Sequence, residues 1–146
     1  MNTKKAAAWV LRAVGALLFA LGLVHIVATP RIPDLLRGSP TVVYERSVGP
    51  TLLNHVLAGI LLLPLGYTTW LAAAAHERGE VWAIRALAAN TGVVLTLPLS
   101  IVVFMRRPEY YTAPLFLAGV GLVAMISLLM VSAMFVLVQG RDSSRV

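Results

Sequence analysis

The chain has 146 residues, of which 59% are hydrophobic and only 12% are charged. Soluble domains are about a quarter charged, so a water-soluble fold of this composition would lack the polar residues to cover its surface. The net charge of +6 comes from Lys and Arg placed singly or in pairs near the ends of apolar stretches, a pattern typical of membrane anchoring that predicts no nucleic-acid partner. The chain has no cysteine, which excludes disulfides, thiolate metal sites and covalently attached c-type haem.

Four apolar stretches are long enough to cross a bilayer as helices, since a helix needs about 20 residues to do so. They run from about 7 to 29, 51 to 75, 83 to 105 and 113 to 138. The chain is therefore predicted to be an all-α integral membrane protein, a bundle of four transmembrane helices that forms a single domain over residues 1–146. Residues 139–146 are predicted to form a polar tail.

Prolines and charged residues separate these stretches. Prolines up to Pro50 are predicted to break the first connection, and residues 33–37 within it are predicted to form a short helix in the membrane interface. Residues 76–80 mark the second connection and residues 106–109 the third. The last helix is predicted to start near Pro114, because proline suits the first turn of a helix.

The basic residues predict an orientation. With the N-terminus in the cytoplasm, seven Lys and Arg residues lie on the cytoplasmic side and five on the outer side. Cytoplasmic ends of membrane helices carry the excess of positive charge. The prediction is an integral protein of a bacterial-type inner membrane or a plasma membrane, with both termini cytoplasmic.

Two histidines are predicted to lie at the same depth. His25 lies four residues before the end of the first stretch, and His55 lies four residues after the start of the second. At a rise of 1.5 Å per residue, each is about 6 Å inside the same membrane boundary, by the predicted orientation the outer one. Polar side chains within spans usually face the bundle interior and are functional candidates. The two imidazoles are therefore a candidate site.

The neighbours of this histidine pair suggest ligands. Gly22 and Gly59 share a helix face with the histidines and would leave room for a flat haem b. A metal ion would need further donors, for which Asn54, Asp34 or Glu45 are available, and a quinone would accept hydrogen bonds from the histidines and from Asn54. In the alternative interpretation, the histidines make interhelical hydrogen bonds and the glycines only let the helices pack closely.

The stretch from Asn54 to Gly59, with His55 inside it, is similar to histidine-bearing spans of small bacterial b-type cytochromes. This resemblance covers one predicted helix of four and assigns no family. It implies haem b as one candidate ligand of His55.

Other polar residues have predicted structural roles. Asn90 is expected to hydrogen-bond across helices to Tyr67 or Thr68. Arg12, one turn after Trp9, is expected to extend its guanidinium to the membrane surface.

The sequence contains no recognisable catalytic set: there is no paired carboxylate in a span, no glycine-rich phosphate loop and no nucleophile elbow. The leading hypothesis is an accessory or structural subunit in the lipid bilayer, bound to a membrane-protein partner or to further copies of itself. Small residues such as Gly121 and Ser132 in the last stretch suit such packing. The alternative is a redox or ligand-binding protein that holds haem b, a metal ion or a quinone between His25 and His55.

Overall fold

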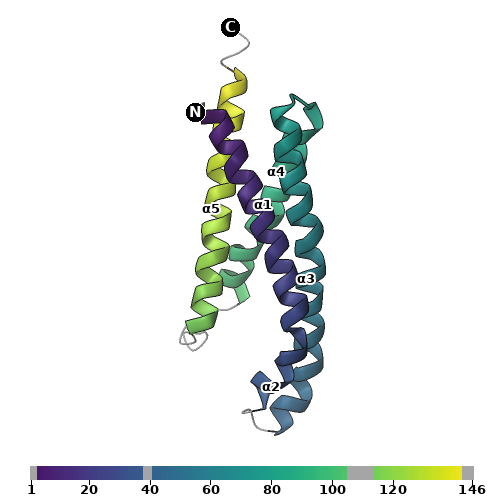
Figure 1. The fold of residues 1–146 in the computed structure, drawn as a ribbon. Coiled ribbons are helices and arrows are strands. Elements are labelled where there is room, and N and C mark those ends of the chain that lie inside the picture. The colour runs from purple at the N-terminus through teal and green to yellow at the C-terminus, as the bar shows by residue number, and fades with distance from the viewer. Residues whose placement is uncertain (1–2, 38–40, 105–113, 143–146) are drawn as a thin grey trace. The chain divides into compact units, whose positions relative to one another are not determined.

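The computed structural model describes residues 3–37, 41–104 and 114–142, and these residues form helices and turns with no strand among them. The helices are α1 (Thr3–Ala28), η1 (Thr29–Arg31), α2 (Ile32–Leu36), α3 (Thr41–Glu77), α4 (Val81–Phe104) and α5 (Pro114–Asp142), as shown in Figure 1. Helices α1, α3, α4 and α5 are long and apolar enough to cross a membrane, which confirms the predicted all-α class with four spans.

Helix α3 begins earlier than predicted. It starts at Thr41 and continues through Pro50, so the predicted break at this proline is wrong. Its 37 residues make a helix of about 55 Å, much longer than the ~30 Å of hydrocarbon that a span must cross. Pro50 removes one backbone hydrogen bond, but it is exposed on the part of the helix that precedes the apolar stretch. A carbonyl freed outside the hydrocarbon can bind water, so the helix tolerates the proline.

The second connection is a tight turn, as predicted. Gly79 has a φ of +80°, a left-handed conformation that glycine adopts without a steric penalty. The backbone N–H groups of Gly79 and Glu80 donate to carbonyls at the end of α3, at 3.0 Å and 3.1 Å. These bonds satisfy carbonyls that the helix end would otherwise leave open.

The other predicted helix boundaries agree with the structure in part. Residues 32–36 form α2, in the place of the predicted short helix, and α5 begins at Pro114. The third connection at residues 106–109 lies outside the described residues. Of the predicted polar tail, residues 139–142 belong to α5, and the remainder lies outside the described part of the chain.

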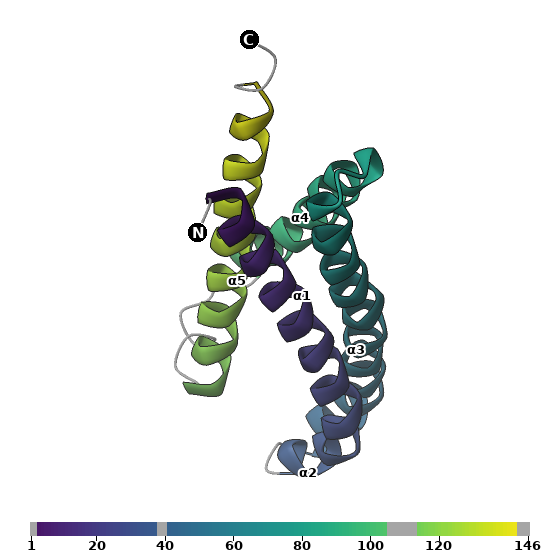
Figure 2. The same cartoon turned by 45° about the horizontal axis from the view of Figure 1, so that its top comes forward.

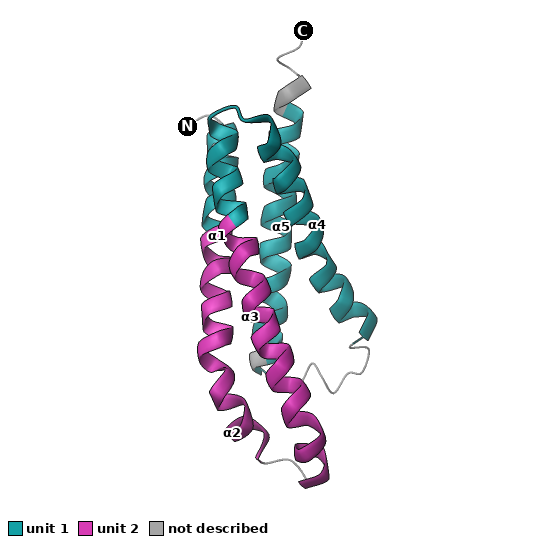
Figure 3. Ribbon diagram, turned by 90° about the vertical axis from the view of Figure 1, so that its right-hand side faces the viewer, with its two compact units in different colours: residues 1–14, 68–146 teal, residues 15–67 magenta. Residues whose placement is uncertain are grey.

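The chain divides into two compact units, coloured separately in Figure 3. Unit 1 comprises residues 1–14 and 68–146, and its core is built mainly from alanines of α1 and α3 with larger side chains of α4 and α5, such as Leu87 and Met130. Unit 2 comprises residues 15–67. Within unit 2, α1 and α3 run side by side in opposite directions, as Figures 1 and 2 show, and their loop end carries α2. A single domain over the whole chain stays a prediction.

Candidate functional site

The helices of unit 2 meet backbone to backbone at glycines. A Cβ atom added to Gly22 would lie 2.9 Å from the carbonyl oxygen of Gly59, and one added to Gly59 would lie equally close to the carbonyl oxygen of Gly22. One heptad away, a Cβ added to Gly66 would lie 2.6 Å from the carbonyl oxygen of Gly15 and would overlap the backbone of Phe19. All four glycines are buried. The helices can approach this closely only because these positions have no side chain.

This contact accounts for the glycines beside the histidines. The space at Gly22 and Gly59 is filled by the opposite helix, so it does not provide room for a flat ring. The interpretation of these two glycines that the structure supports is close helix packing.

The same contact brings the two predicted histidines together. His25 follows Gly22 by three residues and His55 precedes Gly59 by four, so each imidazole lies on the face that meets the other helix. The ring centres are 4.6 Å apart and the ring planes are tilted by 34°. The two rings, which the span boundaries predict to lie at the same depth, are thus in direct contact.

A hydrogen bond to the backbone sets the tautomer of the neutral His25 ring. Its Nδ1 lies 2.9 Å from the carbonyl oxygen of Leu21, and because a carbonyl can only accept, Nδ1 carries the hydrogen. In the neutral ring, Nε2 then has the lone pair. A ring whose second nitrogen donates to a backbone carbonyl is held in one orientation, as metal-binding histidines usually are.

The second imidazole has an unsatisfied nitrogen. Nε2 of His55 is buried, and no described residue makes a hydrogen bond to it. Buried polar atoms without a partner are uncommon and carry a free-energy cost of about 1–3 kcal/mol. A ligand, a water molecule or a proton acceptor at this nitrogen would remove that cost.

The predicted carboxylate donors, Asp34 and Glu45, do not join the pair in a metal-binding group. Asn54 and Glu45 are exposed, and Asp34 forms an exposed ion pair with Arg37 at 3.0 Å. Among the described residues, no three His, Cys, Asp or Glu side chains lie close enough together to hold a metal ion. Of these four residue types, the described part of the chain therefore offers only the two imidazoles to a metal ion at this place.

The ring separation discriminates between ligands. An imidazole nitrogen binds a metal ion at about 2 Å and lies about 1 Å from its ring centre, so each ring centre sits about 3 Å from the ion. Two histidines on opposite sides of a haem iron therefore place their ring centres about 6 Å apart. Two histidines at adjacent positions of one ion, about 90–110° apart, place them about 4–5 Å apart. The observed 4.6 Å is shorter than the separation across a haem iron and lies in the range for adjacent positions.

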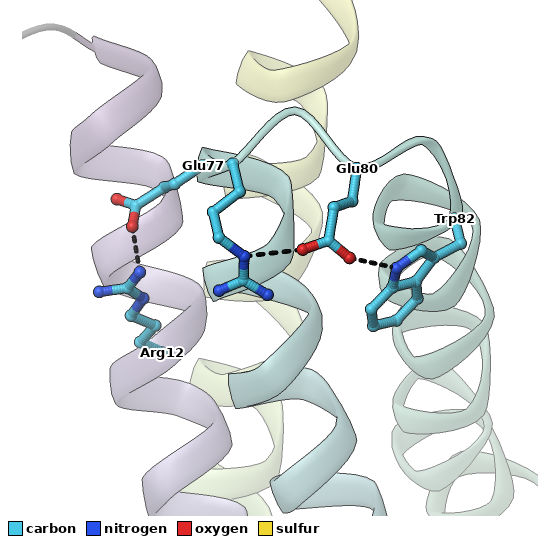
Figure 4. A network of polar contacts seen from close by, with 5 residues as sticks. Arg12, Glu77, Glu80 and Trp82 are labelled. Atoms are coloured by element: carbon cyan, nitrogen blue, oxygen red, sulfur yellow. Dashed lines mark hydrogen bonds and ion pairs between the residues drawn. The ribbon is translucent and has the colours of Figure 1, made fainter.

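Unit 1 contains a polar network that the sequence interpretation missed, shown in Figure 4. Arg12 of α1 forms an ion pair with Glu77 at the end of α3, and its guanidinium carbon lies 5.3 Å from the centre of the Trp9 ring. Arg12 was predicted to extend its guanidinium to the membrane surface, and its pairing with Glu77 was not predicted. Because α1 and α3 are antiparallel, the start of α1 lies near the end of α3. The acidic residue Glu77 at that end was the signal in the sequence that could have predicted a partner for Arg12.

The turn between α3 and α4 forms a second part of this network. The indole N–H of Trp82 donates to the carboxylate of Glu80 at 2.6 Å, and Nε of Arg78 donates to the same carboxylate at 2.7 Å. These two hydrogen bonds, that of Trp82 first, lower the pKa of Glu80 below its ordinary value.

Asn90 joins two helices of unit 1, as predicted. Its side-chain amide donates to the hydroxyl oxygens of Thr68 and Thr69 at 3.0 Å and 2.9 Å. Thr68 was one of its two predicted partners. The bonds are those of a structural contact between α3 and α4.

Comparisons with protein-family models, with curated proteins and with solved structures give no match to this chain.

Proposed function

We propose that this four-span membrane protein binds a divalent transition-metal ion through His25 and His55 as adjacent ligands. The observation that carries the proposal is the 4.6 Å separation of the two ring centres. The orientation of His25 through Leu21 and the unpartnered Nε2 of His55 support it, because each ring then has a nitrogen available for an ion.

The donor set defines the class of ion. Neutral imidazoles suit zinc, copper, nickel and cobalt, whereas calcium and magnesium prefer oxygen. Two protein ligands leave coordination positions for water or another molecule, as in catalytic rather than structural zinc sites.

The test is a titration of the full-length protein in detergent with zinc and with cobalt. We expect one ion per chain, and a loss of affinity of at least about tenfold in His25→Ala and in His55→Ala, because each removes one of two protein ligands. His76→Ala is the matched control, since it removes the third histidine of the chain and leaves the pair intact. Equal affinity in all three variants would contradict the proposal. If the protein binds no ion but binds a quinone through both histidines, the ligand of the histidine pair is a quinone and not a metal ion.

A second candidate function, that of an accessory subunit, rests on glycines of α4 and α5. A Cβ atom added to Gly92, Gly119 or Gly121 would meet no atom of the described residues within 4 Å. Glycine lowers helix stability by about 1 kcal/mol relative to alanine, and in membranes its usual benefit is close approach of another helix. These positions suit contact with a helix of another membrane subunit or of a second copy.

The variant Gly121→Leu tests this candidate, because the larger side chain fits the isolated chain but would block a helix docked there. We expect Gly121→Leu to abolish cross-linked complexes recovered from native membranes while the unfolding temperature in detergent does not fall, because leucine has a higher helix propensity than glycine. Complexes with a second copy and with another protein differ in mass. A protein that is monomeric in native membranes would contradict this candidate.

We also propose that both termini lie in the cytoplasm of a bacterial-type inner membrane or a plasma membrane. The excess of Lys and Arg on that side supports this orientation. Reporter domains fused after residue 146 and within residues 76–80 are both expected to be cytoplasmic.

A further inference from the structure

A pocket in unit 1 is lined by positively charged side chains. It has a volume of about 480 Å³, and its lining residues come from the first three turns of α1 and the last turn of α3. They are Lys4, Lys5, Trp9, Arg12, His76 and Glu77. Three formal positive charges therefore surround the pocket against one carboxylate, so its potential favours an anion.

Arg12 is the group best placed to recognise that anion. Its side chain is 22% exposed, with Nη2 paired to Glu77 and the guanidinium packed near the Trp9 ring. Its Nε is buried and has no hydrogen-bond partner among the described residues. Glu77 thus neutralises part of the charge and orients the guanidinium but leaves one donor unsatisfied.

A phosphate group suits the positive charge of this pocket and the guanidinium that lines it. Its oxygens accept several charge-assisted hydrogen bonds, and a planar guanidinium matches their geometry. Lys4 and Lys5 on the same helix turn add charge at the pocket. Aromatic residues such as Trp9 at the end of a span are typical of the headgroup region, where phosphate groups are abundant. Basic pockets at helix ends are also typical sites for anionic headgroups.

We propose that this pocket binds a phosphate group, with Arg12 as the main donor and an anionic phospholipid as the source at the membrane surface. The site lies within unit 1 and does not depend on ion binding by the histidines of unit 2.

The experiment measures binding of phosphatidylglycerol and of phosphatidylcholine with identical acyl chains to the full-length protein in neutral detergent, by native mass spectrometry. We expect phosphatidylglycerol to be preferred, and Arg12→Gln to weaken its binding about tenfold or more, the effect of losing a charged hydrogen bond. The matched control is Arg85→Gln, which removes an exposed positive charge of α4 that does not line the pocket. It is expected to change binding by less than about threefold, as exposed charges do.

A second variant and a second ligand keep the test decisive. If Arg12→Gln fails to fold, Lys5→Gln takes its place. Lys5 is exposed, so this variant is expected to fold normally and to weaken the binding of phosphatidylglycerol. Inorganic phosphate is titrated against chloride at equal ionic strength. Arg12-dependent binding of inorganic phosphate without preference for phosphatidylglycerol supports the phosphate site with a soluble source. The proposal is overturned if the protein prefers neither phosphatidylglycerol to phosphatidylcholine nor inorganic phosphate to chloride. It is also overturned if Lys5→Gln and Arg85→Gln change the binding of the preferred phosphate ligand equally.

Discussion

The glycines of unit 2 and those of α4 and α5 in unit 1 are used differently, although they look alike in the sequence. Gly22, Gly59 and Gly66 each lie against the backbone of the opposite helix, whereas Gly92 and Gly121 meet nothing in the described residues within 4 Å. A glycine in an apolar helix therefore does not by itself indicate a packed interface within the chain. In unit 2 the glycines set the distance between two helices, and that distance sets the contact between the two imidazoles.

The two units also differ in their candidate chemistry. Unit 2 holds two imidazole rings in contact. Unit 1 has a half-buried arginine paired across two helices and a basic pocket.

The largest effect is expected for Gly66→Ala. The new Cβ would overlap the backbone of Phe19, which cannot move without shifting α1. Overpacking of this kind typically costs about 1–3 kcal/mol and separates the two helices. We expect a clear fall in the unfolding temperature in detergent and a parallel loss of zinc affinity.

The matched control for that variant is Gly92→Ala, where the added Cβ meets no described atom. Here the higher helix propensity of alanine should stabilise the protein by about 0.5–1 kcal/mol. The comparison of the two glycine classes fails if both variants change stability in the same direction and by the same amount.

A smaller effect is expected for Glu77→Gln. The substitution leaves the partly buried guanidinium of Arg12 without its carboxylate, and the loss should lie between that of an exposed and a buried ion pair, about 1–2 kcal/mol. Chemical unfolding in detergent measures it. The double variant Arg12→Gln with Glu77→Gln should lose less than the sum of the two single variants. Additive losses would show that the pair does not interact.

The smallest effect concerns pH and the turn between α3 and α4. Since Trp82 and Arg78 lower the pKa of Glu80, the stabilising contribution of Glu80 is present above the ordinary glutamate pKa of about 4.3 and is lost as pH falls through the lowered value. In Trp82→Phe the pKa should return towards its ordinary value. Between pH 7 and pH 3, the unfolding temperature of the variant should therefore fall less than that of the natural chain. A larger fall in the variant would contradict this assignment.

The sequence was sufficient to predict the number and order of the spans, because each apolar run is long enough to cross a bilayer and is bounded by polar residues. Equal depth of His25 and His55 also followed from the spans alone. The extension of α3 through Pro50 could not be predicted, because the effect of a proline depends on whether water can reach the freed carbonyl.

The roles of individual side chains were harder to predict. Whether Gly22 and Gly59 make room for a ring or for a helix depends on which helix faces them, and helical periodicity does not give that. The pairing of Arg12 with Glu77 likewise required the relative register of α1 and α3.

Electron paramagnetic resonance of the protein loaded with one equivalent of Cu²⁺ tests the central claim most directly, because the spectrum reports how many imidazole nitrogens bind the ion. We predict coupling to two imidazoles in the natural chain and in His76→Ala, and to no more than one in His25→Ala or His55→Ala. The same spectrum in all four proteins, or no bound copper, would contradict the claim that the helix contact of unit 2 presents His25 and His55 to a single ion.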